Sequence, residues 1–141
     1  MRSRTYAAMI CVMVGLGMPT AARAAEPLDS VQGVIQSQLA AFMKDDVAAA
    51  YSFTSPGIQQ KFPNPTDFFD MVKKGYGPLY RPMHFSFGRS RILEGHIFQE
   101  LIVTTSDGKD WTAFYHMIRL PDGSYRVNAI RLFHAAPGHE I

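Results

Sequence analysis

The chain has 141 residues, a length that fits a single domain. Hydrophobic residues make up 47% of it and charged residues 18%, so it can bury a core, and the composition excludes a disordered chain. A formal net charge of +2 without clustered Lys and Arg argues against a nucleic-acid binder. The single cysteine excludes an intramolecular disulfide and a metal site built from several cysteines.

Residues 1–24 have the layout of a secretory signal peptide. Arg2 and Arg4 precede an uncharged apolar run over residues 6–18, and the Ala-Arg-Ala sequence at 22–24 fits a small-x-small cleavage site. The run of 13 residues is shorter than the roughly 20 that span a membrane, so we expect no stable membrane anchor. Cleavage would leave 117 residues with 11 Lys and Arg, 12 Asp and Glu and no cysteine. We therefore expect a periplasmic or secreted protein.

Helices are predicted over the first half of the remaining chain. Apolar residues spaced three and four apart predict an amphipathic helix over 28–44, with Asp29 or Ser30 as its N-cap. Shorter helices, separated by Pro and Gly, are predicted over 47–53, 57–62 and 67–74. The last is expected to be capped by Thr66 and to stop at Gly75.

From residue 83 onward the apolar pattern changes to period two, which is typical of β-strands. Asp-Gly turn signals at 107–108 and 122–123 separate strand-like segments that start near 83, 97, 111 and 125. This pattern predicts an antiparallel meander in an α+β domain over residues 25–134, with the helices packed on one face of a strongly curved sheet. The tail 135–141 is expected to fray.

Several segments resemble an uncharacterised domain-of-unknown-function family of exported bacterial proteins. They are residues 34–42, 50–56, 68–72, 75–82 and 121–127, of which Gly75-Tyr76-Gly77-Pro78-Leu79-Tyr80-Arg81-Pro82 is the most distinctive. The order of elements is similar to the nuclear transport factor 2-like cone, also called the ketosteroid-isomerase-like or SnoaL-like fold. The resemblance implies helices that close the mouth of a bent sheet. It implies no activity, because this fold hosts enzymes, ligand binders and assembly modules.

Residues 75–82 hold the first candidates for ligand binding. Two glycines and two prolines fix an unusual path between the last predicted helix and the first long strand. Tyr76 and Tyr80 supply amphipathic rings and Arg81 a fork of donors, which favours a rim that binds an apolar molecule with a polar or acidic end. In the alternative, the tyrosines pack on the helices and Arg81 pairs with an acid such as Asp70.

The predicted strands carry further candidates. His84 and His116, together with Asp70, would suit a lyase or isomerase if the fold brought them into one pocket. Arg131 alternates in phase with apolar residues, namely Val127, Ala129 and Phe133, so it would need an acid or a ligand anion as partner. Glu100 shares a face with Phe98 and Ile102 and points either into the cone or onto an exposed face.

The sequence contains no HExxH motif, Gly-rich phosphate loop or Gly-x-Ser-x-Gly motif. We therefore expect no metal and no cofactor. Three functions stay open: non-catalytic binding of a small apolar or amphipathic molecule or an envelope partner in the cone, a lyase or isomerase, and a homodimeric module. The dimer would use the open face of the sheet and aromatics such as Tyr115 and Phe133. An apolar pocket with one polar group would favour the binder, and a pocket with two neighbouring ionisable groups the enzyme.

Overall fold

The computed structural model describes residues 20–134 of the chain. The predicted signal peptide lies outside the described residues except for positions 20–24, and the predicted tail 135–141 lies outside them entirely. Cleavage and export therefore stay predictions. Within residues 20–134, none of the helices combines the length and the apolar character needed to cross a membrane.

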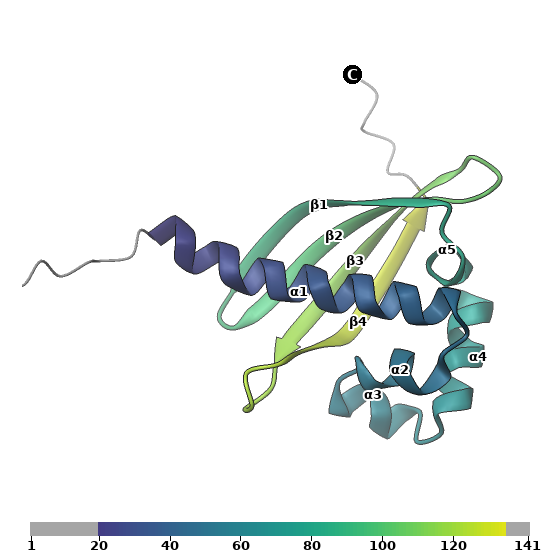
Figure 1. Ribbon diagram of the computed structural model, residues 1–141, viewed down its shortest axis with the longest axis horizontal. Coiled ribbons are helices and arrows are strands. Elements are labelled where there is room, and N and C mark those ends of the chain that lie inside the picture. Colours follow the sequence, from purple (N-terminus) through teal and green to yellow (C-terminus); the bar gives the residue numbers. More distant parts are fainter. Residues whose placement is uncertain (1–19, 135–141) are drawn as a thin grey trace, which may run out of the picture.

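The longest helix, α1 (Thr20–Met43), lies diagonally across one face of the sheet (Figure 1). Its predicted start at Leu28 was wrong, and Asp29 and Ser30 lie inside the helix rather than at its N-cap. The alanine-rich segment before Pro27 explains the earlier start, because alanine has the highest helix propensity. The buried stripe follows the predicted spacing of three and four: Val31, Ile35, Leu39 and Phe42.

Four short helices follow, and they gather at one end of α1 (Figure 1): α2 (Val47–Ser52), α3 (Pro56–Lys61), α4 (Pro65–Gly75) and α5 (Gly77–Tyr80). The cap of α4 differs from the prediction. The side chain of Asn64, not Thr66, is the N-cap, and it accepts a hydrogen bond from the Thr66 backbone N–H at 2.9 Å. Gly75 is the last residue of α4, and α5 was not predicted.

The predicted meander is confirmed. Four antiparallel strands stand in chain order: β1 (His84–Leu93), β2 (His96–Thr104), β3 (Asp110–Arg119) and β4 (Tyr125–His134). We call the face toward α1 the inner face; it buries Ile97, Leu101, Val103, Ala113, Tyr115, Met117 and Val127. In Figure 1 α1 crosses this face of the sheet. The opposite, outer face carries Phe98, Glu100, Phe114, His116 and Arg131.

Two register shifts decide which side chains reach which face. In β1, Gly88 and Arg89 together stand opposite Glu100, which forms a bulge. In β4, one extra residue, Asn128, separates the partners of His116 and Met117. The second shift turns Val127 inward, so the prediction that Val127 shares a face with Arg131 was wrong. An inserted residue reverses the alternation of a strand.

Candidate functional site

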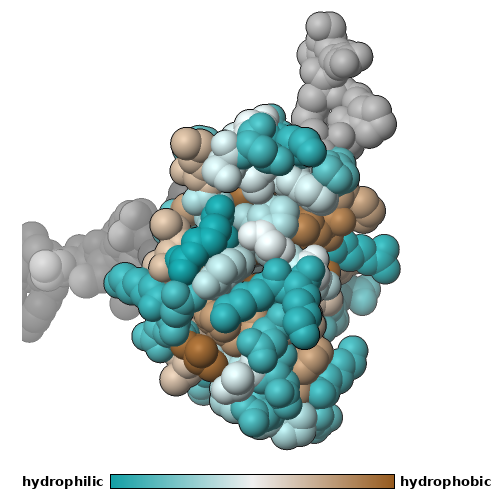
Figure 2. All heavy atoms as spheres, turned by 90° about the vertical axis from the view of Figure 1, so that its right-hand side faces the viewer, coloured by the Kyte–Doolittle hydropathy of each residue, from teal (hydrophilic) through white to brown (hydrophobic). Residues whose placement is uncertain are grey.

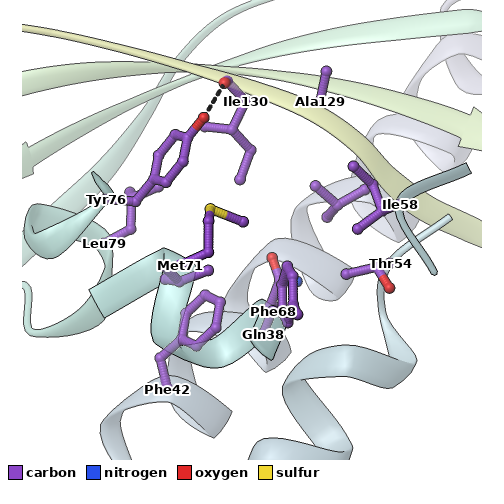
Figure 3. Close-up of a pocket in the computed structure, with 12 residues that line it drawn as sticks. Gln38, Phe42, Thr54, Ile58, Phe68, Met71, Tyr76, Leu79, Ala129 and Ile130 are labelled. Atoms are coloured by element: carbon purple, nitrogen blue, oxygen red, sulfur yellow. Dashed lines mark hydrogen bonds between the residues drawn. The ribbon is translucent and has the colours of Figure 1, made fainter. Parts of the chain in front are cut away.

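An apolar cavity of about 60 Å³ lies between the helices and β4 (Figure 3). Side chains from α1, α3, α4, α5 and β4 line it, and the apolar ones include Phe42, Ile58, Phe68, Met71, Leu79 and Ile130. This volume is several times the roughly 10–15 Å³ that one water needs, and it is below the roughly 150 Å³ of a cavity that binds benzene. The cavity therefore has room for a small organic group.

One side of this cavity borders the surface. Ile58, Met71, Tyr76 and Ile130 are only half-buried, whereas Phe42, Phe68 and Leu79 are buried. Figure 2 shows the end of the molecule formed by the short helices, where hydrophilic side chains dominate and hydrophobic ones form small patches. A ligand would therefore enter past Ile58, Met71 and Tyr76.

Three polar side chains line the cavity, and their hydrogen bonds differ. The Thr54 hydroxyl donates to the Tyr51 carbonyl at 2.6 Å, and the Tyr76 hydroxyl donates to the Ile130 carbonyl at 3.2 Å. Gln38 is 1% exposed, and its Nε2 donates to the Ala50 carbonyl at 3.2 Å. Among residues 20–134, the Oε1 of Gln38 has no hydrogen-bond partner. In Figure 3 this oxygen faces the space between Met71 and Ile58.

The lining holds no Asp, Glu, His, Lys or Arg from the described residues. Tyr76 is its one titratable side chain within residues 20–134. Nor do those residues contain a group of three or more His, Cys, Asp or Glu side chains arranged to hold a metal ion. The cavity thus offers shape, apolar contact and hydrogen bonding to an occupant.

Of the six residues predicted to bind a ligand, Tyr76 lines this cavity. Tyr80 and Arg81 form a separate cluster with Asp45 near the C-terminal end of α1. Arg81 Nη2 lies 2.9 Å from Asp45 Oδ2, the Tyr80 hydroxyl donates to Asp45 Oδ1, and the guanidinium stacks 4.5 Å from the Tyr80 ring centroid. Arg81 therefore has an acidic partner, and this partner is Asp45 rather than the suggested Asp70.

The contacts within this cluster shift the pKa values of Asp45 and Tyr80. The hydrogen bond from Tyr80, and then the charge of Arg81, hold the pKa of Asp45 below its usual value. The same hydrogen bond to Asp45 raises the pKa of the Tyr80 hydroxyl. Both shifts favour the arrangement in which Asp45 is charged and Tyr80 is protonated. A ligand anion would have to compete with Asp45 for Arg81.

The other three predicted residues lie outside the cavity. His84 is exposed at the start of β1, and His116 and Arg131 lie on the outer face. Asp70 lies on the exposed side of α4, so the structure does not bring the proposed catalytic set of Asp70, His84 and His116 into the cavity. A role of these residues in ligand binding stays a prediction.

His116 is the centre of a polar chain on the outer face. Its Nε2 lies 2.8 Å from His96 Nδ1, and its Nδ1 lies 3.2 Å from Asn128 Nδ2. Since Asn128 Oδ1 accepts from the Ser55 hydroxyl at 2.8 Å, Asn128 donates to His116. His116 therefore carries its proton on Nε2 and donates to His96. Burial lowers the pKa of His116, and the electrostatic effect of the neighbouring His96 lowers it further.

The structure places Glu100, Tyr115 and Phe133 on particular faces of the sheet. Glu100 does not point into the cone: it lies on the outer face, yet it is only 5% exposed and accepts a hydrogen bond from Arg89 Nε at 3.1 Å. Tyr115 lies fully buried on the inner face, so it cannot serve a dimer contact on the outer face. Phe133 is 47% exposed on the outer face, as that interpretation requires.

Sequence reasoning missed the most informative residue of the cavity, Gln38. Its position is three residues after Ile35 and four before Phe42, so it falls on the apolar stripe of α1. A polar residue on such a stripe signals either an internal hydrogen bond or a ligand contact. The hydrogen-bond partner of Gln38, Ala50 on α2, and the residues of α4 and β4 that line the cavity with it, lie outside α1 and could not be read from the pattern.

Comparisons with known proteins agree with this architecture. A crystal structure of an NTF-2-like protein of unknown function from Silicibacter pomeroyi DSS-3 is similar, with a TM-score of 0.51 and 12% sequence identity over 82% of this chain and 100% of that chain. At this identity the likeness shows the fold alone, and it confirms the predicted nuclear transport factor 2-like architecture. No curated protein matches the chain. The family model described as Domain of unknown function (DUF4864) matches residues 24–139, and the chain therefore belongs to this family.

Proposed function

We propose that the protein binds a small apolar or amphipathic molecule in the cavity between the helices and β4, without transforming it. The observation that carries the proposal is the cavity itself, an apolar space between the helices and β4. Protein interiors are close-packed, so side chains around a void lack contacts that an occupant would supply. Binding sites for small molecules have this character: a mostly apolar lining with a few polar groups.

The wall beside the surface supports entry of a ligand. Met71 is half-buried in this wall, and methionine adapts its shape readily because its side chain is unbranched. Rotation of this side chain would enlarge an opening of the cavity without moving α4. The ligand would be small, since the cavity volume of about 60 Å³ accommodates only a few non-hydrogen atoms without such rearrangement.

The lining supports binding rather than proton transfer. A general acid or base must lie within hydrogen-bond reach of the reacting atom. The Tyr76 hydroxyl is engaged with Ile130, and the lining from residues 20–134 contains no carboxylate or imidazole. The lyase or isomerase interpretation therefore receives no support from this cavity.

Methionine methyl NMR of the purified protein tests the proposal. Met71 lines the cavity, Met117 is buried outside its lining, and Met83 is exposed on the surface. During titration with small apolar molecules such as 1-butanol and cyclopentane, we expect a saturable shift of the Met71 signal and unchanged Met117 and Met83 signals. An unmoved Met71 signal, or equal shifts of all three, would overturn the proposal.

A cavity-filling variant provides the second arm. Ile58→Phe places a larger side chain at the half-buried wall, and we expect it to abolish the saturable shift of Met71. Ile92→Phe is the matched control, because Ile92 is exposed on β1 and outside the cavity. Binding that survives Ile58→Phe unchanged would place the ligand elsewhere.

A second candidate function is homodimer formation through the outer face. The observation that favours it is a row of exposed aromatic side chains, Phe98, Phe114 and Phe133, which are 39%, 40% and 47% exposed. Sedimentation equilibrium should then give twice the chain mass, and Phe114→Asp should return the monomer. A wild-type protein that stays monomeric at high micromolar concentration would rule out this function.

The location of the protein is also a proposal. We propose that residues 1–24 direct export across the cytoplasmic membrane and are then removed, which gives a periplasmic or secreted protein; the charge and hydropathy pattern of that segment supports this. Mass spectrometry of the protein from its native cells should find an N-terminus at Ala25. An N-terminus at Met1 in the cytoplasmic fraction would contradict export.

A further inference from the structure

We infer that the occupant of the cavity presents an O–H or N–H group to Gln38 Oε1, so the site selects small alcohols or N–H compounds over ethers, ketones and hydrocarbons of the same size. This inference rests on the proposed function and narrows the chemical class of its ligand. It depends on one atom, a buried amide oxygen that faces the cavity and has no hydrogen-bond partner in the described part of the chain.

The contact with α2 fixes the orientation of the Gln38 amide. Its nitrogen donates to the Ala50 carbonyl at 3.2 Å, and Ala50 is fully buried. Exchange of the amide nitrogen and oxygen would place two acceptors, Gln38 Oε1 and the Ala50 carbonyl, against each other. The nitrogen therefore stays toward α2, and the oxygen stays toward the cavity, as Figure 3 shows.

A buried acceptor without a partner carries a desolvation penalty that a donor from a ligand would remove. Gln38 sits among Ile35, Leu39 and Phe42 on the buried stripe of α1, where apolar side chains would pack without that penalty. A ligand O–H or N–H within the cavity would complete the hydrogen bonding of this amide. The amide thereby favours the bound state over the empty one.

The remaining polar groups of the lining favour the same ligand class. The Thr54 and Tyr76 hydroxyls donate their protons to backbone carbonyls, at 2.6 Å and 3.2 Å. These hydroxyls consequently offer an occupant acceptor oxygens but no proton. The described lining also lacks Lys and Arg, so a carboxylate would find no counter-charge. Ketones and ethers cannot donate to the oxygens of Gln38, Thr54 and Tyr76, whereas an alcohol can.

Two isomers separate this inference from the proposed function. 1-Butanol and methyl propyl ether contain the same atoms, but only the alcohol can donate a hydrogen bond. In titrations followed by the Met71 methyl signal, we expect the alcohol to bind about tenfold more tightly than the ether, because a hydrogen bond to a buried acceptor is worth about that factor. Equal affinities would overturn the inference while leaving the proposed function intact. Absence of a Met71 shift with either isomer would overturn the proposed function.

Substitution of Gln38 assigns the preference to this residue. Gln38→Met keeps the length of the side chain and removes the acceptor, so we expect the two isomers to bind with equal affinity. Gln32→Met is the matched control: Gln32 lies on the same helix outside the cavity and loses a comparable bond, from Nε2 to Gln99 Oε1 at 3.3 Å. The control should retain the tenfold preference. A preference that persists in Gln38→Met would contradict the assignment, and the wild-type comparison decides the inference if that variant does not fold.

Discussion

The inner and outer faces of the sheet are made by the same four strands, yet they are organised in different ways. The inner face packs Leu101, Ala113 and Met117 against the helices and excludes water from them. The outer face alternates exposed aromatic side chains with charged or polar ones that bond to each other, as in the pairs Arg89–Glu100 and His96–His116. The inner face thus contributes stability through area removed from water, and the outer face through specific partners.

The largest expected difference between the faces concerns apolar side chains. Leu101→Ala on the inner face should lower the free energy of unfolding by about 2–5 kcal/mol, because it leaves a cavity at a fully buried position. Phe98→Ala on the outer face should cost clearly less, since Phe98 is already partly in water. Denaturant unfolding measures both, and equal losses would show that the outer face is covered in solution.

The next effect concerns Glu100, a buried carboxylate on the outer face. Arg89→Ala leaves Glu100 without its donor, and we expect a loss of about 1–3 kcal/mol in the free energy of unfolding. Arg91→Ala, which removes a neighbouring exposed arginine, is the control and should change the free energy by less than about 0.5 kcal/mol. Similar losses in the two variants would mean that the pair does not hold Glu100.

A smaller effect of opposite sign is expected on the inner face. The Tyr115 hydroxyl is fully buried, it has no hydrogen-bond partner within the described residues, and burial raises its pKa. Tyr115→Phe removes this hydroxyl and keeps the ring, so the free energy of unfolding should stay unchanged or rise by up to about 1 kcal/mol. A fall of more than about 1 kcal/mol in the free energy of unfolding would instead reveal a partner for the hydroxyl, such as a buried water.

The smallest effect is a pH dependence that arises on the outer face. Because the pKa of His116 lies below its usual value of about 6.5, the unfolded chain binds a proton first as the pH falls. The contribution of His116 to stability is therefore complete above about pH 6.5 and declines below it. Carboxyls whose pKa is lowered, such as Asp45 and Asp107, lose their contributions only at more acidic pH.

Unfolding measured at intervals from pH 8 to pH 5 checks this dependence. His116→Phe should flatten the decline, whereas His84→Phe, at an exposed position of β1, should retain it. An equal decline in wild type and His116→Phe would place the titrating group elsewhere.

The sheet was predictable because its signals are local. Alternating apolar residues and two Asp-Gly turns predicted the bounds of β2, β3 and β4 to within about one residue. For β1 they predicted where the strand starts but not where it ends. The turn between β1 and β2 was missed, since it uses Glu94 and Gly95, both with positive φ, and Glu is an unusual residue in that conformation. The inward orientation of the Val127 side chain was not predicted, because no sequence pattern marks the extra residue Asn128.

The candidate site was less predictable, because distant segments build it. Gln38, Thr54, Met71 and Val127 meet in the cavity although no local spacing relates them. The sequence suggested that Arg81 pairs with an acid, but it did not identify Asp45, which lies 36 residues away. The unpartnered state of Gln38 Oε1 depends on which amide atom contacts Ala50, and only the three-dimensional arrangement determines this.

The bulge in β1 has a consequence for how copies of the protein can meet. An unpaired strand edge invites the strand of another chain and so the growth of fibres. Within residues 20–134, one edge of β1 pairs with no other strand; at Gly88 and Arg89 the bulge interrupts its regular row of backbone donors and acceptors, and a charged side chain stands there. On the opposite edge, the Val127 N–H donates to the Phe53 carbonyl at 2.8 Å, and the Ser55 N–H donates to the Val127 carbonyl at 2.9 Å. Both edges thus resist extension of the sheet, which favours the exposed outer face over the strand edges as a surface for association.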